Sequence, residues 1–178
     1  MKGIIFTEFL EMVEKDYGFE VLNNIIDKSN LQSNGVYSGV GTYDHAEFNQ
    51  LLEQLSKVTE LSANDILKKY GHHVFFTFYN NYNAFFANIT HPFQLLEQVD
   101  SHIHKDVQKL YPDAELPRFE TKRIGSDKME MLYSSKRRME HFALGLIEAS
   151  FKHYRIKFSL EINEKGKDSV LFVISLKK

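Results

Sequence analysis

The sequence of 178 residues contains no cysteine. This absence excludes disulfide bonds, thiolate nucleophiles, cysteine-ligated zinc, iron–sulfur clusters and covalent c-type haem attachment. Any metal must therefore be bound through histidine, carboxylate or tyrosine side chains. The chain also lacks an excess of positive charge, because 22 Lys and Arg residues stand against 24 Asp and Glu residues. We therefore expect no nucleic-acid partner.

Long apolar runs are missing as well. No stretch approaches the roughly 18 apolar residues that a membrane-spanning helix needs. The N-terminal residues 1–15 lack a small-residue cleavage site and turn acidic at Glu8. We therefore expect a single cytoplasmic domain over residues 1–178, without a membrane partner.

The first two thirds of the chain show helical periodicity. A first helix is predicted by four apolar residues at spacings of four: Ile5, Phe9, Val13 and Tyr17. It ends at Gly18, and residues 19–28 predict a second helix, followed by a Ser/Asn/Gly-rich loop over 29–42. Asp44 and Ser62 are each followed three residues later by an acidic residue, a spacing that predicts the N-caps of two short amphipathic helices.

The segment from Tyr70 to Phe86 is dense in aromatic residues and too apolar for a one-sided surface helix, so we expect it in the interior. A further helix is predicted to start near Pro92 and to run to Leu110, because Tyr111 is followed by a proline that ends it.

The last third changes to the alternating pattern of strands. Four segments show it: residues 119–124, 129–133, 154–162 and 169–176. Turn residues join them into two hairpins, and residues 139–150 between the hairpins have helical spacing. The predicted class is α+β, a mainly helical N-terminal two thirds followed by a four-stranded antiparallel sheet with one inserted helix.

Eight histidines raise the question of a metal site. His102 and His104 cannot chelate one ion from a helix, because residues two apart point about 200° away from each other. The apolar stripe consists of Leu96, Val99, Ile103, Val107 and Leu110. His104 lies on the flank of this stripe beside Tyr111, whereas His102 lies toward solvent. A lone histidine in this position is usually structural, so position alone leaves both interpretations open.

Tyr133, Ser135 and Arg137 stand at alternate positions at the end of a predicted strand, so two hydroxyls and a guanidinium point to one side. Such a set suits a pair of carboxylates. The alternative is a helix start at which Ser134 or Ser135 is the cap and Arg137 is solvated.

The combination of three motifs resembles the H-NOX family of haem-binding gas sensors. They are the N-terminal Met-Lys-Gly-Ile-Ile, the run Ile103-His104-Lys105-Asp106-Val107-Gln108-Lys109-Leu110-Tyr111-Pro112-Asp113-Ala114-Glu115-Leu116-Pro117, and Tyr-x-Ser-x-Arg at 133–137 followed by Leu144-Gly145-Leu146. Their order and spacing extend the resemblance over essentially the whole chain.

The resemblance implies a haem b buried between a helical N-terminal lobe, about residues 1–60, and a proximal lobe, about residues 61–178. His104 would be the iron ligand. Two residues would press on the macrocycle and distort it: Ile5 and Pro117. Three residues would bind the haem propionates: Tyr133, Ser135 and Arg137.

The resemblance also bears on gas selectivity. Oxygen-binding relatives carry a distal tyrosine nine residues beyond the Tyr133 position, and this chain has Phe142 there. Phe9, Phe78 and Leu146 would complete an apolar cavity. We therefore expect binding of NO and CO without stable O₂ binding. Three side chains could alter this expectation by reaching into the cavity: Tyr79, Tyr82 and His141.

The expected function is NO sensing, with signalling in trans to a sensor histidine kinase or to a diguanylate cyclase or phosphodiesterase, among which the sequence does not select. We expect no enzymatic activity in this chain. A haem peroxidase would need distal acid–base residues, which an apolar pocket lacks, although His141 keeps that alternative open. The other alternative is a haem-free α+β regulatory module that binds an apolar ligand or a protein partner.

Overall fold

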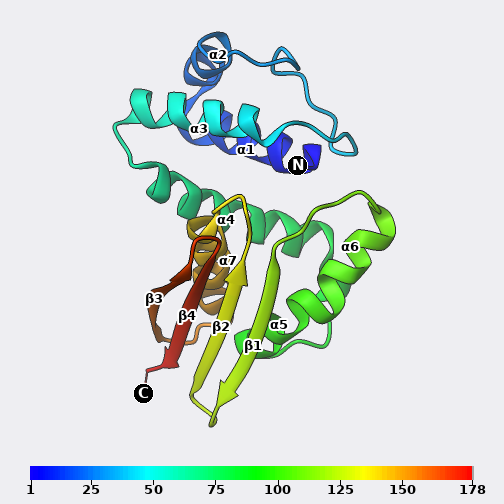
Figure 1. Cartoon of the computed structure of the whole chain (residues 1–178), viewed down its shortest axis with the longest axis vertical. Coiled ribbons are helices and arrows are strands. Elements are labelled where there is room, and N and C mark those ends of the chain that lie inside the picture. Colours follow the sequence, from blue (N-terminus) through cyan, green and yellow to red (C-terminus); the bar gives the residue numbers. More distant parts are fainter. Residues whose placement is uncertain (178) are drawn as a thin grey trace.

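The computed structural model describes residues 1–177, the side chain of Phe85 excepted. Three helices form one end of the molecule (Figure 1): α1 Gly3–Tyr17, α2 Phe19–Asp27 and α3 His45–Thr59. Both predicted caps are present. The Asp44 carboxylate accepts a hydrogen bond from the Ala46 amide at 2.9 Å, and the Ser62 hydroxyl accepts one from the Asp65 amide at 3.1 Å. None of the described helices combines the length and hydropathy needed to cross a bilayer.

Helix α4, Ala63–Asn81, lies between these three helices and the rest of the molecule, and the short helix η1, Asn83–Phe85, follows it (Figure 1). The expectation of a short helix after Ser62 was wrong, because α4 continues through most of the aromatic segment as one helix of 19 residues. Tyr70 packs with the N-terminal helices and Phe75 with the other side of the molecule. Contacts on two faces explain why the segment is too apolar for a surface helix.

The helix predicted from Pro92 to Leu110 is interrupted. It consists of α5 Pro92–Gln98, a π-helical turn η2 Val99–Ile103 and α6 His104–Leu110. Periodicity could not show the interruption, because α5 and α6 each keep helical spacing and the extra residue of the π turn changes only the phase between them.

The remaining elements are β1 Arg118–Ile124, β2 Lys128–Ser134, α7 Glu140–His153, β3 Phe158–Gly166 and β4 Ser169–Leu176. The four strands are antiparallel in the order β1-β2-β4-β3, which confirms the predicted class. One strand was predicted to start four residues early. Tyr154 and Arg155 instead terminate α7, and Arg155 adopts a left-handed φ of 57° that no strand permits.

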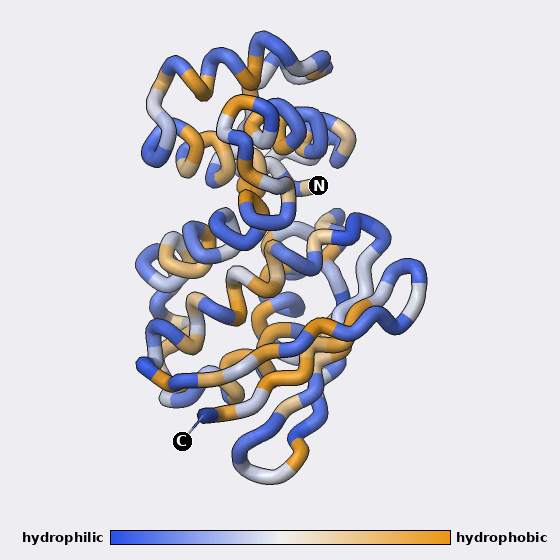
Figure 2. The backbone as a smooth tube through the Cα atoms, turned by 90° about the vertical axis from the view of Figure 1, so that its left-hand side faces the viewer, coloured by the Kyte–Doolittle hydropathy of each residue, from blue (hydrophilic) through white to orange (hydrophobic). Residues whose placement is uncertain are grey.

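Apolar residues recur along the strands and along the helices packed on them (Figure 2). One buried cluster joins α1, α2 and α3 to α4, and a second lies between the sheet and α7. The expected lobe boundary near residue 60 falls in the connection between α3 and α4. Helix α4 itself contributes to the clusters on both of its sides.

Helices α4 and α7 cross at glycines. A Cβ atom on Gly145 would lie 2.0 Å from the Lys68 carbonyl oxygen, and one on Gly71 would lie 2.3 Å from the Phe142 carbonyl oxygen. Both obstacles are backbone atoms, which cannot move aside independently. The two helices can therefore approach this closely only because both positions lack a side chain.

We expect Gly145→Ala to destabilise the protein by about 1–3 kcal/mol through this clash, despite the roughly 1 kcal/mol of helix propensity that alanine gains. Urea denaturation would measure the difference. Gly39→Ala is the matched control, because a Cβ there meets nothing within 4 Å. A Gly145→Ala variant as stable as the control would contradict the close crossing.

Candidate functional site

A cavity of about 310 Å³ lies among α1, α4, α7, β2 and the segment from α5 to Pro117. Most of the side chains that line it are apolar. Its lining also includes most of the residues that the sequence singled out: Ile5, Phe78, His104, Pro117, Tyr133, Ser135, Arg137, Phe142 and Leu146. Residues from four separate parts of the chain therefore meet at one cavity.

His104 is the first residue of α6 and follows the π turn directly. Its side chain is 17% exposed, and its Nδ1 atom lies 3.4 Å from Oδ1 of Asp100, one turn earlier. Burial lowers the pKa of His104, although Asp100 and the Pro117 backbone act in the opposite direction. A neutral imidazole whose Nδ1–H faces a carboxylate keeps the lone pair on Nε2 for a metal.

The apolar residues of α6 are not in the protein core. Leu110 is 65% exposed, and none of the α6 residues is buried. Val107 and Leu110 instead line the cavity. The apolar stripe predicted from the sequence is therefore present, but on this helix it faces the cavity.

The part of the cavity formed by α1, α4 and α7 is apolar. Ile5, Phe78, Phe142 and Leu146 all contribute, and Val74, which the sequence analysis did not identify, lies with them. The Phe142 ring stacks on Tyr70 with 4.9 Å between centroids. The Tyr70 hydroxyl is occupied elsewhere, since it donates a hydrogen bond to the Ile5 carbonyl at 2.6 Å.

Phe9 does not line the cavity, contrary to the expectation. It is fully buried, and its ring packs on Phe48 and Tyr70 in the N-terminal core, so that Tyr70 separates it from Phe142. Of the three side chains that could have reached in, Tyr82 is among the lining residues. Tyr79 and His141 are not, and the Tyr79 ring packs on His153 with 4.2 Å between centroids.

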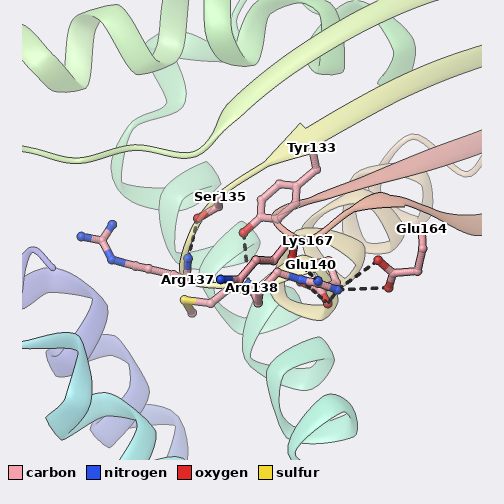
Figure 3. Close-up of polar contacts among 8 residues, drawn as sticks. Tyr133, Ser135, Arg137, Arg138, Glu140, Glu164 and Lys167 are labelled. Carbon is pink, nitrogen blue, oxygen red and sulfur yellow. Dashed lines mark hydrogen bonds and ion pairs between the residues drawn. The ribbon is translucent and has the colours of Figure 1, made fainter.

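Tyr133 is the second-to-last residue of β2 and lines the cavity, and Figure 3 shows its hydroxyl close to the start of α7. That hydroxyl accepts a hydrogen bond from the Met139 amide at 3.1 Å. Burial raises the pKa of Tyr133, so the hydroxyl keeps its proton and can donate it to an acceptor. The Ser135 hydroxyl accepts a hydrogen bond from the Arg137 amide at 3.2 Å. The serine also retains its proton for donation.

Two consecutive arginines follow, and they have different partners. Arg138 binds Glu140 and Glu164, whereas the Arg137 side chain extends away from Tyr133 and Ser135 (Figure 3). The Arg137 guanidinium donates to the Glu115 backbone carbonyl at 2.7 Å and to the Glu115 carboxylate. Of this pair, only Arg137 lines the cavity.

The donor set fits a haem. One neutral imidazole enters an apolar cavity from α6, as an iron ligand requires. The edge of the same cavity carries two hydroxyls and a guanidinium that already binds a carboxylate, the group that a haem propionate would present.

The segment after α6 is also tied to the N-terminal end of the molecule. Nζ of Lys2 lies 3.1 Å from the Asp113 carboxylate, which accepts a second hydrogen bond from the Thr42 hydroxyl at 2.6 Å. These two hydrogen bonds lower the pKa of Asp113. The Asp113 carboxylate therefore connects the segment that contains Pro117 to Lys2, just before α1, and to Thr42, after α2.

Comparisons with known proteins agree with this geometry. A family model described as Haem-NO-binding matches residues 2–162. A comparison with curated proteins gave no match.

Three solved structures are similar over nearly the whole chain. The Fe(II) unliganded H-NOX protein from K. algicida is 39% identical, with a TM-score of 0.94 and coverage of 100% of this chain and 97% of that one. The IWP-051-bound H-NOX from Shewanella woodyi, in the Fe(II)CO state, is 32% identical, with a TM-score of 0.85 and coverage of 98% and 94%. The S. oneidensis H-NOX protein in the Fe(II)NO state is 24% identical, with a TM-score of 0.91 and full coverage of both chains, and supports the fold alone.

The family model spans most of the chain, and the K. algicida and S. woodyi proteins match 100% and 98% of this chain. This chain therefore belongs to the H-NOX family of haem-binding gas-sensor domains.

Proposed function

We propose that this protein binds haem b and senses NO in the cytoplasm. One observation carries the proposal: His104 and the donors Tyr133, Ser135 and Arg137, which lie far apart in the sequence, line one apolar cavity. If His104 were only structural and residues 134–137 only a solvated helix start, there would be no physical reason for both to line the same cavity.

Ferrous haem would supply the iron that binds a diatomic gas. His104 would hold that iron through Nε2, oriented by Asp100 at Nδ1. Tyr133 and Ser135 would donate hydrogen bonds to the propionates, and Arg137 would exchange Glu115 for a propionate. Ile5 and Pro117, which both line the cavity, would press on the macrocycle.

The selectivity would follow from the apolar part of the cavity. Bound O₂ carries partial negative charge and gains from a hydrogen-bond donor, whereas NO and CO need one far less. Phe142 offers none, and the Tyr70 hydroxyl behind it is already bonded to Ile5. A donor worth about 1–3 kcal/mol would change O₂ affinity by about 5- to 150-fold. The protein would therefore bind NO and CO in air.

The response would pass from His104 to the N-terminal helices. His104 would hold the haem iron, and release of His104 would free α6 and the following segment to move and would relieve the pressure on Ile5. Asp113 would transmit that movement to Lys2 and Thr42. The partner would detect the new position of the N-terminal lobe. It would be a histidine kinase, diguanylate cyclase or phosphodiesterase acting in trans.

The test is the visible absorption spectrum of the reduced protein, recorded without air and then with O₂, CO and NO. We expect a five-coordinate ferrous haem that forms CO and NO complexes but no stable O₂ complex. A stable O₂ complex would refute the selectivity and would direct attention to Tyr82. A protein that takes up no haem would refute the function and favour the haem-free binding module.

We expect His104→Gly to lose the bond between protein and iron, because no other described histidine lines the cavity. Added imidazole should restore a histidine-like spectrum by filling the space. His102→Gly is the control, since His102 is exposed and should leave the spectrum unchanged. Unchanged spectra in His104→Gly would show that another residue is the ligand.

We expect Phe142→Tyr to gain O₂ affinity, up to the roughly 150-fold that a full hydrogen bond allows. The O₂ affinity of the ferrous protein would be measured by gas titration. Phe76→Tyr is a matched control, because Phe76 lies on α4 outside the cavity lining. Equal O₂ affinities in the two variants would mean that a hydroxyl at residue 142 cannot reach the bound gas.

A further inference from the structure

A second group of metal-ligating side chains lies away from the cavity, between α1 and α4. Glu8, Glu11 and His73 each offer one ligand atom, and these three atoms all lie within 4.8 Å of one another. None of the three residues lines the cavity. The group is therefore separate from the site that His104 serves.

The two helices hold the group in place. Glu8 and Glu11 are three residues apart on α1 and so lie on one face of that helix. His73 faces them from α4, with Nε2 3.2 Å from a Glu8 carboxylate oxygen. The helices are fixed against each other at this level by Phe9 and Tyr70, whose rings are 5.3 Å apart.

Burial and charge both favour a cation. The Glu8 and His73 side chains are each 13% exposed, so water screens them weakly, whereas Glu11 is exposed and leaves an entry path. In the described part of the chain, neither Glu8 nor Glu11 forms an ion pair with a lysine or arginine. Among the described residues, the His73 imidazole is therefore the one basic group paired with Glu8.

We propose that Glu8, Glu11 and His73 form a binding site for a divalent transition-metal ion, of which zinc is the representative. Zinc accepts imidazole nitrogen and carboxylate oxygen at about 2.0–2.2 Å, so ligand atoms this close need only side-chain adjustment. Three protein ligands leave one or more positions for water on the Glu11 side. The ion would join α1 to α4, one turn from Ile5.

The protein itself contains a matched pair that should not bind an ion. His72, the neighbour of His73, contacts Glu148 on α7 at 2.9 Å, with side chains about one third exposed. It is the same kind of contact between a histidine and a glutamate on two helices. Among the described residues, no third carboxylate or histidine joins this pair. If surface histidines bound zinc without specificity, the His72–Glu148 pair and the group of Glu8, Glu11 and His73 would bind it equally well.

The experiment is calorimetric titration of zinc into the ferrous CO complex, in which the haem iron would occupy His104. If the protein takes up no haem, the titration uses the His104→Gly variant, so that failure of the haem proposal does not affect this test. We expect one zinc ion per chain. Glu11→Gln should weaken binding by about tenfold or more, the loss seen even for groups outside the ligand shell. His72→Gln should bind zinc as the unaltered protein does.

Thermal unfolding supplies an independent measurement. Zinc should raise the melting temperature of the unaltered protein and of His72→Gln, because an ion that binds only the folded state stabilises it. It should have little effect on Glu11→Gln, whose exposed side chain can change without disturbing the fold. Absence of zinc binding, or equal binding by Glu11→Gln and the unaltered protein, would overturn the proposal.

Discussion

The contact between α4 and α7 is the constraint on which the rest of the structure depends. Gly71 and Gly145 let the two backbones approach more closely than any side chain would allow. The same contact brings Val74 of α4 beside Phe142 and Leu146 of α7 over the cavity. Because the other face of α4 holds the N-terminal helices through Tyr70, one helix crossing both shapes the cavity and carries the part of the molecule proposed to move.

The chemistry of the cavity is divided by position. Most of its lining residues are apolar, and the donors Tyr133, Ser135 and Arg137 come together from the end of β2 and the residues that follow it. His104 fits this division because burial keeps its imidazole neutral while Asp100 fixes its orientation. Arg137 fits it in another way, since its charge is balanced by Glu115 at the rim.

Local signals in the sequence were sufficient for much of the fold. The Asp44 and Ser62 caps and the alternating strands depend on near neighbours, and the structure confirms them. The continuity of α4 was missed because its apolar residues belong to two separate buried clusters. Periodicity alone cannot show whether a helix contacts one cluster or two. The place of Phe9 was missed for a related reason. Buried and pocket-lining aromatic residues have the same spacing on a helix. In the structure, the Tyr70 ring packs on both Phe9 and Phe142 and so lies between Phe9 and the cavity.

The π turn Val99–Ile103 fixes the direction in which His104 points. A π turn contains one residue more than the α-helical turn it replaces, and each residue of an α-helix advances by about 100°. Removing one residue from this turn would therefore restore a regular helix with His104 still facing the cavity. Straightening the turn at unchanged length would rotate His104 out of it. In evolutionary terms, the turn is a place where the chain can shorten by one residue while His104 keeps its direction.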